Sequence, residues 1–422
     1  MQNLRTLQIA VAGAIVLSAS YALIVRDQSV NVSVDSEDGS SIRHVVNGER
    51  GEFRLKDDER ILSAKWRGDF DLAATGDAIA ALEDTLEIEL EENGAVARAV
   101  LEKKADAIET RYFLDGEEQP EGAQTDAAIA ELVVAFLRAS GVKAQARVEA
   151  LIAAGGANAV LAEIGAMDND NAIQRYAVAL SRQAEMSDAE VGALAQTLKT
   201  VESDGEVQQA LSAIIENQTV SAEVAPLLLD AARGIEGDHD MRKLLETFAE
   251  GPLNAEAADL AIDLYARIDG DYDLRKAAEA LLENDALTDA QAARILETAA
   301  DRIDGDHDMR LVLGETALRF SDTAAFTEAW LAGFDALQSS NEQRLSIEEA
   351  AEGDHPAEAW AALIERTEAI GSDHDRRLAM QAIAERIDAS DQTLAAAYRA
   401  AAEGIGSDHD RRRALEALED GG

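Results

Sequence analysis

The feature that most constrains this chain is a short motif that returns at nearly constant spacing through its C-terminal half. The reference copy, called the signature below, reads Ile-Asp-Gly-Asp-Tyr-Asp-Leu-Arg at residues 268–275. Close copies begin at Ile235, Ile303, Ile370 and Ile405, and a degenerate copy begins at Leu337. Its fourth positions are separated by 33, 35, 34, 33 and 35 residues, and they are Asp238, Asp271, Asp306, Ser340, Asp373 and Asp408. Such a period predicts a repeat protein rather than one compact core.

Apolar residues after each signature follow a helical period. In the reference copy Leu274, Ala277, Ala278, Leu281 and Leu282 fall on one helical face. A second helix is predicted to end at the next isoleucine, over residues 254–268, 288–303, 322–337, 356–370 and 390–405.

The same spacing extends towards the N-terminus, where Asp204 and Asp170 lie one and two steps of 34 residues before Asp238. Residues 121–422 are therefore predicted to form an α-solenoid of about eight two-helix repeats of about 34 residues, HEAT-like or tetratricopeptide-like in length. The Trp, Gly-Tyr and Pro positions of the tetratricopeptide consensus are absent. Each helix pair would bury its apolar face only by stacking on its neighbours.

Residues 29–120 show a period of two instead. Apolar and polar residues alternate in the segments 30–34, 52–55, 70–72 and 86–90, as in half-buried strands. The dipeptides Asp38-Gly39, Asn47-Gly48, Asn93-Gly94 and Asp115-Gly116 favour tight hairpin turns. We expect a small antiparallel sheet or β-roll here, although residues 78–82 also suit a helical turn. Thr125 is predicted to cap the first helix that follows. The whole chain is thus α+β in class and mainly α.

Residues 1–28 read as an export segment. Residues 9–25 carry no charge, and a run of about 17 residues is close to the minimum that spans a bilayer. Small residues Ser18 and Ser20 also suit a signal peptide, but the apolar run continues to Val25 and favours an uncleaved membrane anchor. Either alternative predicts an extracytoplasmic protein, at the inner membrane or in the periplasm.

The charge of the chain restricts its partners. A formal net charge of −45 makes nucleic acid and anionic lipid head groups poor partners, because phosphates would be repelled. Cationic proteins or divalent ions would be attracted, although an acidic surface also serves solubility alone. The chain has no cysteine, so disulfides and thiolate metal sites are excluded.

The charged residues of the signature are predicted to start and tie helices. Asp271 suits a helix N-cap, and Arg275, four residues later, suits an ion pair within the same helix. Alternatively, these charges pair between neighbouring repeats as a ladder. The predicted structural cap residues are Asp238, Arg242, Asp271, Arg275, Asp306, Arg310, Asp373, Arg377, Asp408 and Arg412.

Two binding alternatives compete with this structural interpretation. The openings at residues 269–273 and 304–308 imitate the D-x-D-x-D start of a calcium loop, but the glycine required at its sixth position is Leu274 or Met309. His239, His307, His374 and His409 share one repeat position, yet Tyr272 and Asn341 occupy it elsewhere, which argues against a shared zinc site. The sequence contains none of the common hydrolase, metalloprotease or nucleotide-binding motifs, so we expect neither catalytic residues nor a cofactor.

Several segments resemble a poorly characterised family of bacterial envelope proteins. The similar stretches are 111–120, 146–152, Gly155-Gly156 with 160–164, and the signatures themselves. Members of this family combine a membrane segment, a β domain and helical repeats, and a similar module occurs behind antirepressor-type membrane metallopeptidases. This chain lacks any peptidase motif. The resemblance implies a non-enzymatic scaffold or sensor in the cell envelope that binds a protein partner or a second copy of itself.

Overall fold

The computed structural model of the chain describes residues 30–420 except 36–40, 48–49, 58–59 and 252. The predicted export segment at residues 1–28, with its apolar run 9–25, lies outside the described residues. Among those that are described, every helix is too short or too polar to cross a lipid bilayer. The chain divides into two compact units, at residues 1–235 and 236–422. This division falls inside the predicted repeat region, and each unit is described separately below.

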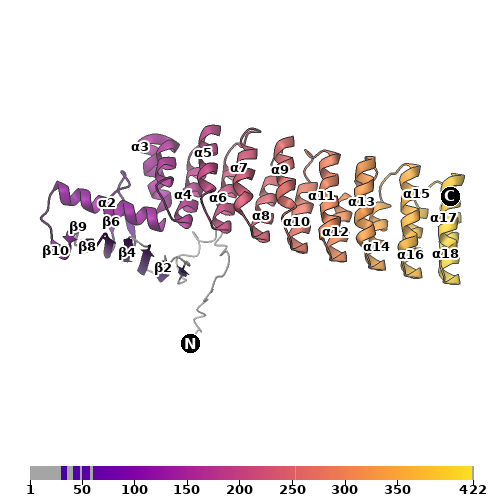
Figure 1. Cartoon of the computed structure of the whole chain (residues 1–422), viewed down its shortest axis with the longest axis horizontal. Coiled ribbons are helices and arrows are strands. Elements are labelled where there is room, and N and C mark those ends of the chain that lie inside the picture. Colours follow the sequence, from indigo (N-terminus) through magenta and orange to yellow (C-terminus); the bar gives the residue numbers. More distant parts are fainter. Residues whose placement is uncertain (1–29, 36–40, 48–49, 58–59, 252, 421–422) are drawn as a thin grey trace, which may run out of the picture. The chain divides into compact units, whose positions relative to one another are not determined.

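The first unit contains the predicted antiparallel sheet (Figure 1). Eight of its described strands form one sheet in the order β1-β2-β3-β4-β7-β8-β9-β10, with every neighbouring pair antiparallel. A separate pair joins β5 (Phe70–Leu72) and β6 (Ile79–Leu82), so the segment that also suited a helical turn is a strand. The strands of the large sheet are β1 (Val30–Asp35), β2 (Ser41–Asn47), β3 (Arg50–Lys56), β4 (Arg60–Arg67), β7 (Thr85–Glu92), β8 (Ala95–Lys104), β9 (Ala107–Leu114) and β10 (Glu117–Glu118).

Two of the predicted hairpin turns connect strands of this sheet. Asn93 and Gly94 have φ angles of 52° and 80°, and they join β7 to β8. Asp115 and Gly116, with φ angles of 50° and 84°, join β9 to β10 in the same way. Positive φ at both central residues is the geometry of the twisted two-residue hairpin, which Asn-Gly and Asp-Gly favour. The two dipeptides near residues 38 and 47 lie at least partly outside the described residues.

Helix α2 (Ala123–Ser140) covers one face of the sheet and closes its core. Val133, Phe136 and Leu137 of this helix are buried with Phe53 and Ile88 of the strands. The helix begins after Gly122, so the predicted cap Thr125 lies inside it and instead donates its hydroxyl to the Pro120 carbonyl at 2.6 Å. The chain enters the helix before Thr125 because Gly122 adopts a positive φ of 155°.

The rest of the first unit is helical. It contains α3 (Ala144–Ile164), α4 (Asp170–Gln183), α5 (Asp188–Leu198), α6 (Asp204–Asn217) and α7 (Ala225–Ala231), followed by the short 3-10 helix η1 (Ala232–Gly234). Helix α3 is kinked at Gly155 and Gly156, whose φ and ψ angles are not helical. Helices α4 and α6 begin at Asp170 and Asp204, the two positions that the extended spacing indicated.

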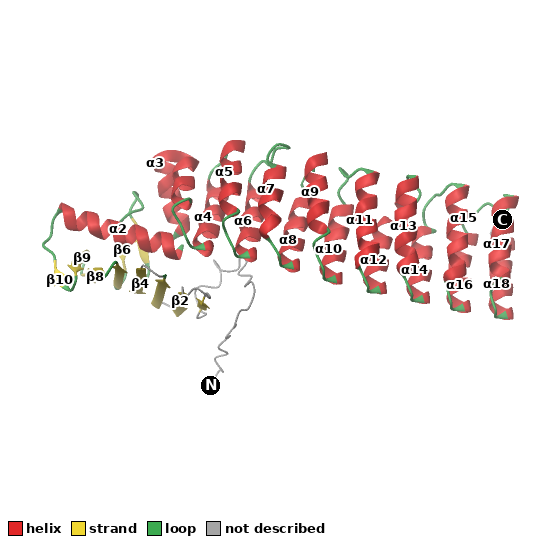
Figure 2. Ribbon diagram, in the orientation of Figure 1, coloured by secondary structure: helices red, strands yellow, loops and turns green. Residues whose placement is uncertain are grey.

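The second unit consists of two alternating kinds of helix (Figure 2). The signature helices begin at the fourth signature residue, and they are α8 (Asp238–Ala249), α10 (Asp271–Leu282), α12 (Asp306–Thr316), α14 (Ser340–Ala350), α16 (Asp373–Ala384) and α18 (Asp408–Asp420). The connecting helices are α9 (Ala255–Tyr265), α11 (Asp289–Arg302), α13 (Ala324–Ala336), α15 (Ala357–Arg366) and α17 (Gln392–Glu403). The 3-10 helices η2 (Ala317–Arg319) and η3 (Thr367–Ala369) follow α12 and α15.

Each signature helix packs against the next signature helix, from α8 to α18. The connecting helices form a second row, in which α9 packs on α11, α11 on α13, and α15 on α17. The apolar first residue of every signature is buried, and these residues are Ile235, Ile268, Ile303, Leu337, Ile370 and Ile405. The prediction of a mainly helical chain with an antiparallel sheet and helical repeats is therefore confirmed.

Candidate functional site: the repeat joints and their outer face

The predicted cap residues lie where one signature helix meets the next signature. We call each such contact a joint. Within the second unit the described joints connect α8 to α10, α10 to α12, α12 to α14, α14 to α16, and α16 to α18. The structure brings the predicted residues together at these joints, but in roles that differ from local capping.

The aspartate at the fourth signature position is not the N-cap. The N-cap of α10 is Gly270, which has no side chain to offer, and Asp271 is the first helical residue. The same holds for Asp238 after Gly237 and for Asp306 after Gly305. In α16 the N-cap is Ser372, whose hydroxyl accepts from the amide of Asp375. The cap assignment was therefore wrong by one residue, because the glycine or serine before the aspartate takes the extended N-cap conformation.

The carboxylate of this aspartate instead reaches across the joint. Asp271 accepts hydrogen bonds from the backbone N–H groups of Asp304, at 3.4 Å, and Gly305, at 2.8 Å. These N–H groups belong to the second and third residues of the next signature. The same two-amide contact is made by Asp238, Asp306 and Asp373, and by Asp170 in the first unit. A carboxylate offers two acceptor oxygens, which fits a pair of neighbouring amides.

Ser340 makes a reduced version of this contact. Its hydroxyl accepts only one hydrogen bond across the joint, from the amide of Ser372 at 3.1 Å. A neutral hydroxyl is also a weaker acceptor than a carboxylate. The joint between α14 and α16 is therefore chemically the weakest of the five at this contact.

The arginine at the eighth signature position also bonds across the joint, and not to the aspartate four residues before it. Arg275 Nε donates to Asp308 at 2.6 Å, and Asp308 is the sixth residue of the next signature. Equivalent pairs lie at 2.6 to 3.1 Å, and they are Arg242–Asp273, Arg310–Glu342, Arg344–Asp375 and Arg377–Asp410. The predicted i,i+4 pair within one helix is thus wrong, and the alternative of a ladder between repeats is confirmed.

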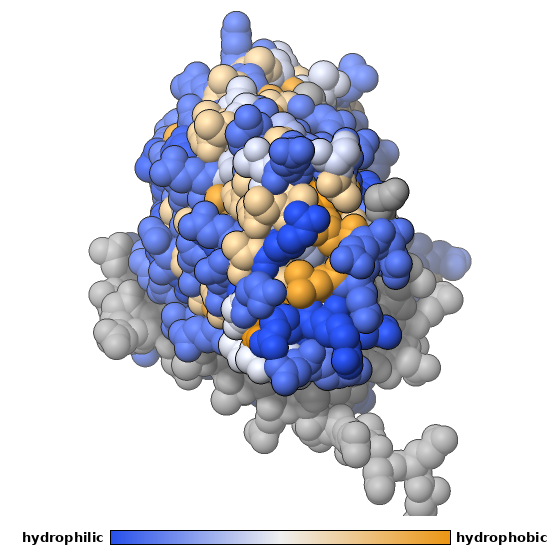
Figure 3. All heavy atoms as spheres, turned by 90° about the vertical axis from the view of Figure 1, so that its right-hand side faces the viewer, coloured by the Kyte–Doolittle hydropathy of each residue, from blue (hydrophilic) through white to orange (hydrophobic). Residues whose placement is uncertain are grey.

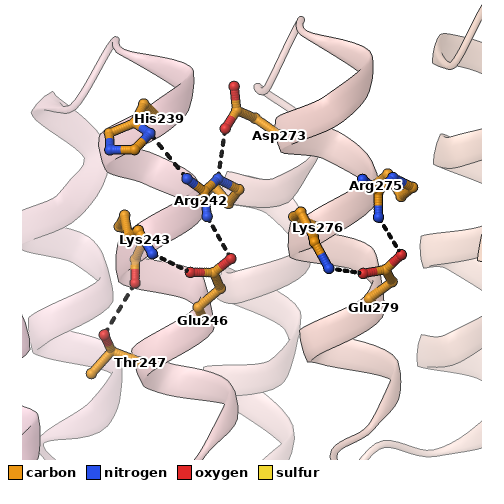
Figure 4. A network of polar contacts seen from close by, with 9 residues as sticks. All are labelled: His239, Arg242, Lys243, Glu246, Thr247, Asp273, Arg275, Lys276 and Glu279. Atoms are coloured by element: carbon orange, nitrogen blue, oxygen red, sulfur yellow. Dashed lines mark hydrogen bonds and ion pairs between the residues drawn. The ribbon is translucent and has the colours of Figure 1, made fainter. Parts of the chain in front are cut away.

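Other donors of Arg242 and Arg275 are used within their own helices (Figure 4). Arg242 Nη1 donates to Glu246 at 2.6 Å, and its Nη2 contacts His239 Nδ1 at 3.0 Å. Arg275 likewise bonds to Glu279, while the exposed ring of Tyr272 lies 5.1 Å from its guanidinium carbon. A guanidinium has a fixed fork of five N–H donors, which suits three acceptors in different directions.

These arginines are charged although they are largely buried. The five ladder side chains are only 7% to 16% exposed. Burial alone would lower the pKa of Arg242, but hydrogen bonds with Asp273 and Glu246 outweigh burial and raise the pKa. The same balance raises the pKa of Arg275, with Glu279 and Asp308 as partners. Removing one of the two acids would leave the buried arginine only partly compensated.

One joint obtains its third acceptor from the neighbouring repeat. The residue four positions after Arg310 is Gly314, which has no side chain. Arg310 Nη1 instead donates to Glu349 of α14 at 2.7 Å. A Cβ at Gly314 would come within 2.5 Å of Glu349 Oε2, so the glycine leaves the space that Glu349 fills.

Sequence reasoning missed one ladder arginine and the five acids that pair with the ladder arginines, and it included two residues that lie outside the ladder. Arg344 was omitted because its signature is degenerate, although the spacing from Arg310 would have indicated it. Asp408 and Arg412 belong to α18, the last described helix. There Asp408 accepts from Arg411, and Arg412 lies 4.0 Å from Glu416 of its own helix.

The geometry also bears on the metal-binding alternatives. The carboxylates that resemble a calcium loop are engaged by arginine and by backbone amides, as described above for Asp271 and Asp308. The histidine row is spread over separate helices, where His239 and His374 each contact the arginine three residues later. Among the residues that the structure describes, no cluster of three or more His, Asp or Glu side chains is arranged to hold a metal ion.

The outer face of the signature helices differs between repeats, in contrast to the joints. The residue after the ladder arginine is Lys243, Lys276, Leu311, Leu345, Leu378 or Arg413, in chain order. The three leucines are half-buried and belong to the neighbouring helices α12, α14 and α16. Leu318, in the 3-10 helix η2 that follows α12, is 63% exposed. By contrast, the face of the second unit that carries α18 shows a mainly hydrophilic surface around a small apolar area (Figure 3).

The first unit contains a hollow of about 380 Å³ on its sheet. Its lining includes Lys65, which pairs in register with Glu52 on one neighbouring strand and Glu87 on the other. Arg50 and Arg67 line the same hollow. Charges of both signs alternate there, so the hollow indicates no particular class of ligand.

No protein family, curated protein or solved structure matches this chain. The resemblance to bacterial envelope proteins therefore stays a prediction.

Proposed function

We propose that this chain is a non-enzymatic scaffold or sensor module that binds a protein partner in the bacterial cell envelope. In this proposal residues 121–422 act as an α-solenoid of about eight repeats, and the export segment places it outside the cytoplasm. The binding surface is the outer face of the signature helices.

The observation that carries this proposal is the contrast between joints and outer face. Joint residues repeat almost unchanged, and their charges bond to one another. The neighbouring outer position changes from lysine to leucine to arginine, and it places the half-buried Leu311, Leu345 and Leu378 on an otherwise acidic protein. Apolar side chains gathered on a charged surface are typical of interaction sites.

The cation-responsive alternative receives less support from the geometry. Its carboxylates would have to release arginines and backbone amides before they could bind calcium. The hydrolase alternative lacks a described nucleophile or acid pair that would single out a site.

Site-specific photocrosslinking tests the proposal. A photoreactive residue replaces Leu318, an exposed leucine of η2 that directly follows α12, and the control replaces Leu114 of the sheet, which is 42% exposed. Both full-length variants are expressed in cells that carry them in the cell envelope, the intact cells are irradiated, and the variants are purified under denaturing conditions. We expect one protein species to crosslink at position 318 and not at position 114.

Recovery of the chain alone from position 318, and from further outer positions such as 272 and 345, would refute partner scaffolding. Crosslinks between two copies of the chain would assign self-assembly instead.

A further inference from the structure

We infer that Leu311, Leu345 and Leu378, here called the leucine row, bind a basic amphipathic α-helix that lies across the signature helices α12, α14 and α16. The inference rests on the proposed function and adds the shape and charge of the partner segment.

The leucine row is held in register by the joints. Each leucine directly follows a ladder arginine, and α12, α14 and α16 are consecutive neighbours. The bonds from Ser339 to Asp306 and from Ser372 to Ser340 fix the starts of α14 and α16 against the preceding helices. Because these helices start at equivalent residues, their sixth residues lie side by side in one row.

Carboxylates lie beside the leucine row and just past the ends of its helices. Glu315 lies four residues after Leu311, on the same face of α12. Glu352 and Glu385, both exposed, lie just beyond the last residues of α14 and α16, which are Ala350 and Ala384. We call these three residues the carboxylate band.

Carboxylates outnumber cations around Glu315. Burial raises its pKa, the nearby carboxylates of Glu283 and Glu279 raise it further, and Lys276 acts in the opposite direction. Additional cations beside these groups would stabilise their ionised forms. A partner with lysine or arginine next to its apolar face would supply them.

The spacing of the row fits a helix. Packed helices lie about 8–10 Å apart, and an α-helix rises about 1.5 Å per residue. One step between neighbouring signature helices therefore corresponds to about five to seven residues of a crossing helix, and a step of seven, about two turns, returns to the same helical face. A partner helix of about four turns would place apolar residues near positions i, i+7 and i+14 against the three leucines.

The occupant is a different protein rather than a second copy. The chain carries a formal net charge of −45, so two copies would repel each other at an acidic face. The row ends at positively charged residues on both sides, Lys276 in α10 and Arg413 in α18. These ends limit the apolar contact to three helices.

A designed peptide tests the inference with the full-length chain. The probe is a fluorescent helical peptide of about 21 residues, with leucine on one stripe at a period of seven and lysine along one flank. One control peptide has the same composition in scrambled order, and a second replaces every lysine with glutamate. Binding is measured by fluorescence anisotropy at two salt concentrations.

The protein variants separate the row from general effects. The triple variant Leu311→Ser, Leu345→Ser, Leu378→Ser removes the apolar contact, and Leu227→Ser is the matched control because Leu227 is an exposed leucine of the first unit. A second variant, Glu352→Lys with Glu385→Lys, reverses the charge of the band while it keeps the row. Thermal melting checks that each variant remains folded.

We expect the lysine peptide to bind at least about tenfold more tightly than either control peptide, with weaker binding at high salt. The triple variant should lose at least about tenfold in affinity, and Leu227→Ser should change it less than about twofold. The charge-reversed variant should prefer the glutamate peptide.

The inference would be overturned if the scrambled peptide bound as tightly as the lysine peptide, or if the lysine peptide did not bind at all. It would also be overturned if the triple variant and the charge-reversed variant both bound the lysine peptide as tightly as the wild-type chain does. The broader scaffold function is judged separately by the photocrosslinking. A partner that still crosslinks to the triple variant would preserve the scaffold and refute only the leucine row.

Discussion

Replacing Asp271 tests whether the carboxylates at the fourth signature position hold neighbouring repeats together. In Asp271→Ala the amides of Asp304 and Gly305 lose their acceptor, and the Gly305 amide is partly buried. Leaving a buried donor unsatisfied costs about 1–3 kcal/mol, whereas the exposed amide can bond to water. The expected cost is therefore about 2 kcal/mol, confined to the joint between α10 and α12.

The chain supplies its own intermediate case. Ser340 fills the same position with a single hydrogen bond. Asp271→Ser should therefore cost about 1 kcal/mol, and Ser340→Asp should stabilise the joint between α14 and α16 by about the same amount. The matched control is Asp263→Ala, which removes an exposed surface pair with Arg294 and should cost less than about 0.5 kcal/mol.

Hydrogen exchange followed by mass spectrometry measures each joint locally. Exchange in residues 303–310 should become about thirtyfold faster in Asp271→Ala and about fivefold faster in Asp271→Ser. Residues 370–377 should exchange about fivefold more slowly in Ser340→Asp. If the amides of residues 303–310 exchange no faster in Asp271→Ala than in Asp263→Ala, the carboxylate of Asp271 does not hold the joint.

Three further predictions concern single positions in the second unit. Arg376 is buried, its Nε lacks a hydrogen-bond partner, and burial lowers its pKa. Arg376→Met should therefore raise the melting temperature, because it removes a buried charge. A lower melting temperature would show that the protein compensates this charge. Burial and neighbouring carboxylates raise the pKa of Glu315 in the folded protein. The folded state therefore favours the protonated side chain, and the free energy of unfolding falls as the pH rises from the pKa of the unfolded chain to the higher pKa of the folded protein. Glu315→Gln should therefore stabilise the protein at pH 7 and have no effect near pH 3; equal effects at both pH values would contradict this. The double variant Gly314→Glu with Glu349→Ala gives Arg310 an acceptor in its own helix and removes a helical glycine. The double variant should be more stable than wild type by about 1 kcal/mol, and also more stable than either single variant. If the stability changes of the two single variants simply add up in a double-mutant cycle, residues 314 and 349 do not serve the same donor of Arg310.

The parts of the fold that follow local rules could be predicted from the sequence. The helical face after each signature and the Asn93-Gly94 hairpin both depend on neighbours within a few residues. The connecting helices were predicted within a few residues of their observed ends, as in α11, where the predicted start Thr288 is the N-cap. The insertion of β5 and β6 between β4 and β7 was not predicted, because it depends on which strands meet across the sheet.

The joints were predicted only in outline. An aspartate at the start of a helix suits both the N-cap and the first turn, and sequence alone did not separate these roles for Asp271. Its partners lie 33 and 34 residues further along the chain, so no local pattern shows them. The ladder was one of two alternatives for the same reason. The leucine row was missed because Leu311, Leu345 and Leu378 look like ordinary helical residues until the repeats are aligned in space.

The shared direction of the joint contacts makes most repeats interchangeable. Most signatures offer a carboxylate and an arginine to the following repeat and present two amides and an acid to the preceding one; Ser340 and the Arg310–Glu349 pair are the exceptions. Removing residues 271–305 would join Gly270 directly to Asp306 and would place Asp308 opposite Arg242, where Asp273 now lies. Repeats with the regular contacts can thus be lost or duplicated without a mismatched joint, and a lineage of such proteins could lengthen or shorten its binding surface while these connections keep the same chemistry.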